Sequence, residues 1–147
     1  MAGRRINDGM GGFIARILVK MLIGAERPVK GSKIGILGLT FKENVPDLRN
    51  SRVPDIVAEL RDFGIEAQVA DALADPELVE HEYGMDLVPF ERLKSLDGLI
   101  FAVPHDAYTG LGSDTLFSAL APGGIFIDVK SAVRRDEVPT GVRYWSL

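Results

Sequence analysis

The stretch Lys33-Ile-Gly-Ile-Leu37, followed at once by Gly38-Leu-Thr-Phe-Lys-Glu-Asn-Val-Pro-Asp-Leu-Arg-Asn-Ser51, decides the fold class of this 147-residue chain. Its first five residues form a short apolar run, which is typical of a strand buried on both faces. Its second part opens with glycine and carries Lys42 and Arg49, with Arg52 just beyond it. Basic residues between a buried strand and a helix are a common way to bind an anion. The stretch therefore predicts a site for a phosphorylated ligand.

A helix is predicted directly after this stretch. Ser51 is a candidate N-cap, and Pro54 falls in the first turn, where its missing N–H costs little. Apolar residues then recur at helical spacing and form the expected buried face: Val53, Ile56, Val57 and Leu60. Gly64 follows as the residue that stops the helix.

Strand and helix patterns alternate along the rest of the chain. Apolar or alternating runs predict strands at residues 65–70, 85–88, 99–103, 125–129 and 143–147, and helical patterns cover residues 76–83 and 115–120. Two of these strands, residues 99–103 and 125–129, are nearly continuous apolar runs and too short for helices, as expected for parallel strands with both faces covered. We expect an α/β fold, with a Rossmann-like, doubly wound, mainly parallel sheet between two helical layers.

An amphipathic helix precedes the sheet. Apolar residues from Met10 to Leu22 recur at helical spacing and form one stripe, which ends near Gly24. We expect residues 1–25 to be a helix that is part of something larger, residues 26–32 to be a linker, and residues 33–147 to be the sheet domain. Because the stripe has no partner next to it in the sequence, we expect it to face another domain or a second copy, which predicts a homodimer.

Composition excludes several classes of function. A net charge of −4 argues against nucleic acid as a partner, because nucleic-acid modules usually carry a basic excess. The chain has no cysteine and only two histidines, so we expect neither disulfides nor a metal site. The longest apolar stretch, Ile17–Ile23, is interrupted by Lys20 and is far too short to span a bilayer. We expect a soluble, cytoplasmic protein without a signal peptide.

The order of the predicted strands locates the anion site. In a doubly wound sheet, ligands bind outside the carboxyl ends of the strands, where the strand order reverses. Those ends carry Phe41 and Lys42 after the first strand, His105 after the fourth and Lys130 after the fifth. An aromatic face for a base or sugar beside two cations for phosphates suits a nucleotide diphosphate.

A family resemblance rests on these residues. The pattern Gly-x-x-Phe-Lys, six residues, then Arg-x-Ser, which begins at Gly38, resembles the third domain of the UDP-glucose/GDP-mannose dehydrogenase family, which holds the UDP-sugar. Its variant Phe-Lys-Glu-Asn-Val-Pro-Asp-x-Arg-Asn-Ser is similar to the branch that oxidises UDP-N-acetylhexosamines to uronic acids. The segment Gly3-Arg-Arg-Ile-Asn-Asp-Gly-Met10 resembles the family's helix between the central and the nucleotide-sugar domain. This resemblance implies that residues 1–25 are the C-terminal part of that inter-domain helix.

The resemblance implies roles for four residues. By position, Phe41 and Lys42 contact the UDP-sugar, Arg49 reaches NAD, and Lys130 stands where the family has a substrate-binding arginine. A lysine there departs from the family, because it lacks the bidentate fork of a guanidinium group. The catalytic cysteine and the main NAD domain would lie outside this chain, which carries no cysteine, so we expect the chain alone to be inactive and to hold no catalytic residue.

A stand-alone nucleotide- or NAD(P)-binding Rossmann module without catalysis is the alternative. The glycines disfavour it, because Phe41 stands where the last glycine of Gly-x-Gly-x-x-Gly is expected, and Asp71 follows Gly38 by about thirty positions instead of about twenty. Each candidate also has a purely structural interpretation. Arg49 pairs with an acidic neighbour, His105 caps a helix or is exposed, and Asp128 caps a loop, while Arg52 is expected on a solvated helix turn.

Overall fold

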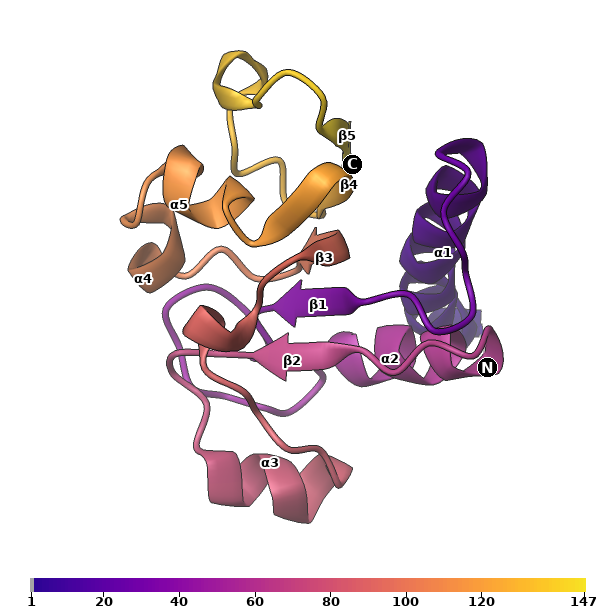
Figure 1. Cartoon of the computed structure of the whole chain (residues 1–147). Helices are drawn as coiled ribbons and strands as arrows, with labels where there is room; N and C mark the ends of the chain where they lie inside the picture. Colours follow the sequence, from indigo (N-terminus) through magenta and orange to yellow (C-terminus); the bar gives the residue numbers. More distant parts are fainter. Residues whose placement is uncertain (1) are drawn as a thin grey trace.

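Five strands form one sheet in which every neighbouring pair is parallel, in the order β2-β1-β3-β4-β5 (Figure 1). The computed structural model describes residues 2–147, with side chains from residue 9 onward. Along the chain the elements are α1 Ala2–Gly24, β1 Ile34–Leu37, α2 Val53–Asp62, β2 Gln68–Ala70, α3 Pro76–Tyr83, the 3-10 helix η1 Phe90–Arg92, β3 Leu96–Phe101, α4 Asp106–Thr109, α5 Ser113–Phe117, β4 Leu120–Asp128, the 3-10 helix η2 Arg135–Glu137, and β5 Arg143–Ser146. The predicted Rossmann-like, doubly wound α/β fold is confirmed.

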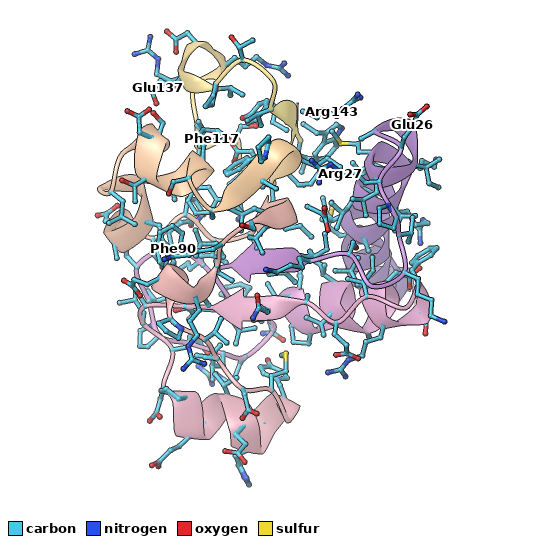
Figure 2. The ribbon with its side chains drawn as sticks, viewed as in Figure 1. Glu26, Arg27, Phe90, Phe117, Glu137 and Arg143 are labelled. Atoms are coloured by element: carbon cyan, nitrogen blue, oxygen red, sulfur yellow. The ribbon has the colours of Figure 1, made fainter. Side chains whose placement is uncertain are left out.

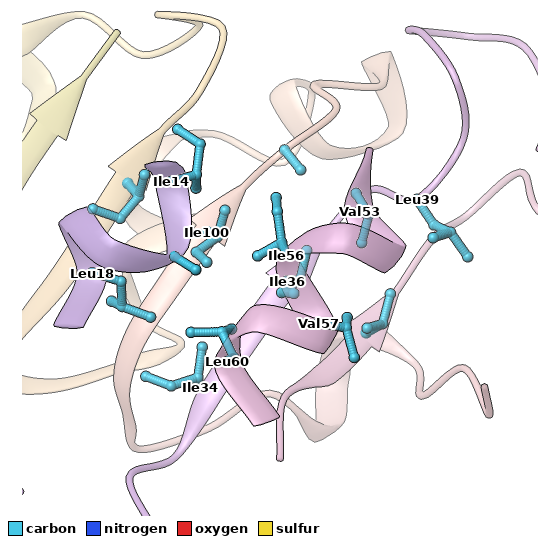
Figure 3. Packing of buried hydrophobic residues seen from close by; sticks show 14 of the residues in the cluster. Ile14, Leu18, Ile34, Ile36, Leu39, Val53, Ile56, Val57, Leu60 and Ile100 are labelled. Atoms are coloured by element: carbon cyan, nitrogen blue, oxygen red, sulfur yellow. The ribbon is translucent and has the colours of Figure 1, made fainter. Parts of the chain in front are cut away.

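Side chains alternate across the sheet and build two cores. Ile34 and Ile36 of β1 belong to a cluster with α1 and α2, which Figure 3 shows from close by. Leu37 belongs to the opposite cluster, together with Phe101 of β3. Figure 1 shows α1 and α2 on one side of the strands and α4 and α5 on the other, and Phe117 lies on the side away from α1 (Figure 2). This is the three-layer arrangement expected of parallel strands that are apolar on both faces.

Helix α1 covers the sheet of its own chain. Ile14, Leu18 and Leu22 are fully buried and pack in the same cluster as Ile34 and Ile100. The expectation that this stripe faces another domain or a second copy is therefore wrong for its buried residues. The residues next to the stripe in the sequence do not cover it, but strands that come later in the chain pack against it. The assignment of residues 1–25 to an inter-domain helix remains a prediction, and the side chains of residues 3–8 in the Gly3–Met10 motif lie outside the described residues.

The segment between α1 and β1 is anchored at the amino ends of the strands. Arg27 donates to Asp97 Oδ1 at 2.5 Å and also to the carbonyl of Pro122. Lys33 N–H donates to Asp97 Oδ2 at 2.8 Å. These contacts tie residues 26–33 to the start of β3 and to the first part of β4, so the amino-terminal helix and the sheet share one packed unit.

Local details differ from the predicted elements. Residues 85–88 form a single parallel bridge, Val69 to Leu87, instead of a full strand. Pro89 follows at once and has no N–H to extend the pairing. Helix α2 has Arg52 as its N-cap, while Ser51 Oγ accepts from Val53 N–H at 3.2 Å and donates to the Leu39 carbonyl. Within residues 2–147, no helix has the length and hydropathy needed to cross a bilayer.

Candidate functional site

The point where the strand order reverses lies between β1 and β3. From β1 the chain proceeds to β2 on one side, and β3, β4 and β5 follow in order on the other side. The segment 38–52, called the switch loop below, leaves β1 at this point. Gly38 has φ +99°, and a Cβ built on it would lie 2.6 Å from the backbone N and O of Val103. Only glycine allows the chain to turn this close to the end of β3.

Asp71, directly after β2, holds the first residues of the switch loop. Its Oδ2 accepts the N–H groups of Leu39 at 2.6 Å and Thr40 at 3.1 Å. Its Oδ1 accepts the N–H groups of residues 73 and 74. Burial alone raises the pKa of this carboxyl, but the hydrogen bonds from the backbone and from His105 outweigh it and lower the pKa below its ordinary value. Asp71 is therefore an ionised anchor of the loop.

His105, after β3, holds the middle of the switch loop. Its imidazole is fully buried, with Nε2 at 2.9 Å from Asp71 Oδ2 and 3.1 Å from Thr40 Oγ1. Its Nδ1 accepts the N–H of Asn44 at 2.9 Å. The interpretation of His105 as exposed is wrong, because the residue is buried. His105 does occupy the N-cap position of α4, but its side chain makes no cap hydrogen bond. The sequence did indicate that His105 lies close after an apolar strand, at the sheet edge where the carboxyl ends of the strands meet.

A cavity of about 80 Å³, the switch-point cavity, opens at the carboxyl ends of β1, β3 and β4. Phe41 from the switch loop and Lys130 from beyond β4 line it, and Arg52 at the start of α2 joins them. Its apolar wall includes Ile14 of α1 and Val103. The Phe41 side chain is 46% exposed, so its ring is available to a ligand.

The structure brings some predicted residues together and separates others. Phe41 and Lys130 share the switch-point cavity, as expected from the topology. Lys42 is exposed on the same loop but is not among the residues that line this cavity. Arg52, expected on a solvated turn, does line it. Lys130 Nζ lies 3.7 Å from Glu43 Oε1, an ion pair that spans from the β4 end to the switch loop.

Arg49 lies on a different side of the switch loop. Its guanidinium donates to Asp47 at 3.1 and 3.2 Å, and its side chain is 87% exposed. These hydrogen bonds lower the pKa of Asp47 and raise that of Arg49. Both residues border a cavity of about 410 Å³ between the loop and α3, where Tyr83 donates its hydroxyl to the Leu48 carbonyl. Arg49 thus serves a surface separate from that of Phe41.

Asp128, at the end of β4, holds the turn that carries Lys130. Its carboxylate accepts the N–H groups of Ala132 at 2.9 Å and Val133 at 2.8 Å, and the hydroxyl of Tyr144 at 2.6 Å. Burial and the neighbouring carboxylate raise the pKa of Tyr144 to about 12, so it remains a donor. The interpretation of Asp128 as a loop cap agrees with these contacts.

The chemistry available at the switch-point cavity is that of binding. Among the side chains described from residue 9 onward, two cations and one aromatic ring border it, and none of these lining side chains is a carboxylate, imidazole or thiol. Among the side chains the structure describes, no group of three or more His, Cys, Asp or Glu residues is placed to hold a metal ion. A ligand that fits this lining combines negative charge with a planar ring.

Comparisons with known proteins match this chain to one family. The model of the UDP-glucose/GDP-mannose dehydrogenase family, UDP binding domain, matches residues 35–135. Protein CapL of Staphylococcus aureus is 40% identical over all 147 residues, which are 34% of its own length. UDP-N-acetyl-D-glucosamine 6-dehydrogenase of Pseudomonas aeruginosa is 37% identical over 137 residues, covering 93% of this chain and 32% of that protein.

A solved structure gives the same result for the fold. The structure of NDP-N-acetyl-D-galactosaminuronic acid dehydrogenase from Methanosarcina mazei Go1 superposes with a TM-score of 0.81 at 22% identity. The match covers 97% of this chain and 30% of that one. The present chain therefore spans about a third of the length of the relatives that it matches.

Proposed function

We propose the function of this chain from one premise: the chain belongs to the UDP-glucose/GDP-mannose dehydrogenase family, as its UDP binding domain. In this proposal the switch-point cavity receives the UDP part of a nucleotide sugar. Phe41 stacks on the base or ribose, Lys130 and Arg52 face the phosphates, and Lys42 meets them from the exposed part of the switch loop. The supporting observation is that Phe41 and Lys130, which are 89 positions apart in the sequence, line the same cavity.

The whole enzyme, in this proposal, oxidises a UDP-N-acetylhexosamine to the uronic acid with NAD. The name of the Pseudomonas relative supports the substrate, and the share of the relatives that this chain spans supports a longer enzyme. The catalytic centre and most of the NAD site belong to the part of the relatives that this chain does not match. NAD supplies the hydride acceptor. We further propose a cytoplasmic homodimer as the working form.

The residues of this chain fit a single peripheral contact with NAD and not a complete NAD-binding site. Arg49 is an exposed cation beside a cavity of about 410 Å³, which suits contact with a phosphate that is held mainly by another domain. Asp71, the acidic residue after β2, has a fully buried side chain whose oxygens accept backbone N–H groups. It is therefore not free to bind a ribose, and this disfavours the alternative of a stand-alone NAD(P)-binding module.

Titration of the 147-residue chain with UDP, followed by amide shifts in NMR, tests the binding proposal. We expect shifts in residues 38–52 and around Lys130. Lys42→Ala and Lys130→Ala should each weaken binding by about tenfold or more, the value of one charge-assisted contact. Arg61→Ala is the matched control, because Arg61 lies at the far end of α2 and pairs with Glu66 on the surface. Equal losses from Arg61→Ala, or shifts centred elsewhere, would contradict the site.

The order of the UDP and NAD affinities separates the proposal from its alternative, and two other outcomes test the proposal itself. NAD titrated into the same chain should bind more weakly than UDP, and the reverse order would favour the NAD(P)-binding module. The chain should produce no NADH from UDP-sugars, because it carries no cysteine to act as nucleophile. Arg49→Ala should leave UDP binding unchanged and should impair NAD use only in the complete enzyme.

A further inference from the structure

We propose that His105 is a positioning residue that holds residues 40–44 of the switch loop, and with them Phe41 and Lys42, in the geometry that binds the ligand. The proposal rests on the function proposed above. His105 contacts the switch loop but not the ligand. It is fully buried and is not among the residues that line the switch-point cavity.

The hydrogen bonds of His105 require one tautomer. Nδ1 accepts the N–H of Asn44 at 2.9 Å, and a backbone N–H can only donate, so this nitrogen carries the lone pair. Nε2 lies 2.9 Å from a carboxylate oxygen of Asp71, so it carries the hydrogen. The hydroxyl of Thr40 donates to the Lys42 carbonyl at 3.1 Å, which leaves its oxygen to share that hydrogen. The neutral Nε2–H tautomer satisfies every contact.

The two nitrogens have separable tasks. Asp71 already binds the N–H groups of residues 39–40, so the start of the loop does not depend on His105. Asn44 sits at φ +64° and is joined twice to the start of α4, through its N–H to His105 and through its Oδ1, which accepts from Asp106 N–H at 2.9 Å. Phe41 lies between these two anchors. The Nδ1 contact therefore fixes the distal side of the segment that presents the ring.

Two substitutions separate the tasks. In His105→Asn, the amide oxygen can take the position of Nδ1 and still accept from Asn44, while the contact with Asp71 is lost. In His105→Gln, the amide nitrogen can take the position of Nε2 and still donate to Asp71, while Asn44 loses its acceptor. His81→Gln on the exposed face of α3 is the control. If His105 positions the loop, UDP affinity should follow the Asn44 contact.

We expect His105→Gln to weaken UDP binding by about tenfold or more and to speed hydrogen exchange at the Asn44 amide. His105→Asn should retain UDP affinity within about threefold, even where urea unfolding shows it to be less stable than His105→Gln. UDP affinity that instead follows the urea midpoints of the two variants would assign His105 a structural role and overturn the proposal. Wild-type affinity in His105→Gln would do the same.

NMR measurements on the unmodified chain test the role of His105 without relying on the variants or on UDP binding. The ¹⁵N shifts of His105 should report the Nε2–H tautomer, and a coupling across the hydrogen bond should join Asn44 N–H to Nδ1. An Nδ1–H tautomer or the absence of that coupling would overturn the proposal even if neither variant folds. If the unmodified chain does not bind UDP, the proposed function fails, whereas the exchange rate at Asn44 still decides whether His105 holds the loop.

Discussion

One carboxylate oxygen of Asp71 accepts hydrogen bonds from the backbone N–H groups of residues 39–40, and the other accepts them from residues 73–74. The site residues Phe41 and Lys42, by contrast, are exposed. An exposed side chain on a loop is useful to a ligand only when the backbone that carries it has one conformation. At the scale of single residues, the buried carboxylate of Asp71 holds the loop backbone in one conformation, and this conformation places the exposed Phe41 and Lys42.

Asp71→Asn should destabilise the chain by at least about 1.5–3 kcal/mol, the range for one hydrogen bond to a charged group. An amide nitrogen cannot accept a backbone N–H, so at least one donor loses its partner. Urea unfolding at neutral pH measures the loss. Asp75→Asn is the matched control, because Asp75 caps α3 with a bond from Glu77 N–H and asparagine caps a helix about as well. A loss no larger than that of the control would contradict the anchor role.

The lowered pKa of Asp71 also predicts how stability depends on pH. The folded state binds this proton less readily than the unfolded state, so the contribution is complete above the ordinary pKa of 3.8 and is lost as pH falls further. The unfolding free energy of the unmodified chain should therefore fall on acidification below about pH 4, and that of Asp71→Asn should fall less steeply. Parallel pH curves for the two proteins would show that Asp71 does not titrate as inferred.

Gly38→Ala should be more destabilising than Gly112→Ala, although both glycines have positive φ, at +99° and +88°. The left-handed backbone alone costs a side chain on the order of 1–3 kcal/mol, and this cost is common to the pair. Only at Gly38 would the new Cβ also meet the backbone of Val103, whereas nothing lies within 4 Å of it at Gly112. Equal unfolding midpoints for the two variants would contradict the close approach of β1 and β3.

At the scale of elements, the contact between α1 and α2 is close because a glycine stands in it. A Cβ on Gly11 would lie 2.6 Å from the Cβ of Asp55 and 3.2 Å from the backbone N of Ile56. Gly9, two residues earlier in the same helix, has nothing within 4 Å. Alanine is favoured over glycine in a helix by roughly 1 kcal/mol wherever space allows.

Gly9→Ala should accordingly raise the unfolding free energy by up to about 1 kcal/mol, and Gly11→Ala should lower it. Both changes add the same methyl group to the same helix, so the difference in sign isolates the contact with α2. Thermal unfolding of the two variants side by side is sufficient. Stabilisation by both would mean that α1 stands further from α2 than described.

At the scale of the whole molecule, α1 and the sheet share one hydrophobic core. Leu18 is fully buried in the cluster that contains Ile34 and Ile125, whereas Ile23 on the same helix is 62% exposed. Leu18→Ala should cost about 2–5 kcal/mol, and Ile23→Ala should cost little. Fluorescence of Trp145 and far-ultraviolet circular dichroism should report one coincident transition in the unmodified chain. A separate early transition of the helix would contradict the shared core.

Local pattern was enough to predict most elements of the sheet and its class. Uninterrupted apolar runs such as Leu99–Val103 indicated buried parallel strands, because side-chain periodicity is a property of neighbouring residues. The point where the strand order reverses followed from the same reasoning, and it correctly brought Phe41 and Lys130 to one cavity. Residues 85–88 were overestimated, because a short pattern does not reveal whether a neighbour offers a full ladder of hydrogen bonds. Element bounds were also too wide elsewhere: the strand predicted at 65–70 is only Gln68–Ala70, and the helix predicted at 115–120 ends at Phe117.

Contacts between residues far apart in the sequence decided the rest. The amphipathic pattern of α1 specified an apolar face but not what covers it, because the partners of Ile14 and Leu18 lie on strands that come later in the chain. Asp71 and His105 were not identified as loop anchors, because their partners stand 32 and 61 positions away. The direction of a loop side chain depends on which distant groups satisfy the backbone polar atoms around it. Sequence therefore determined which residues could bind an anion, and tertiary structure decided which of them share a cavity.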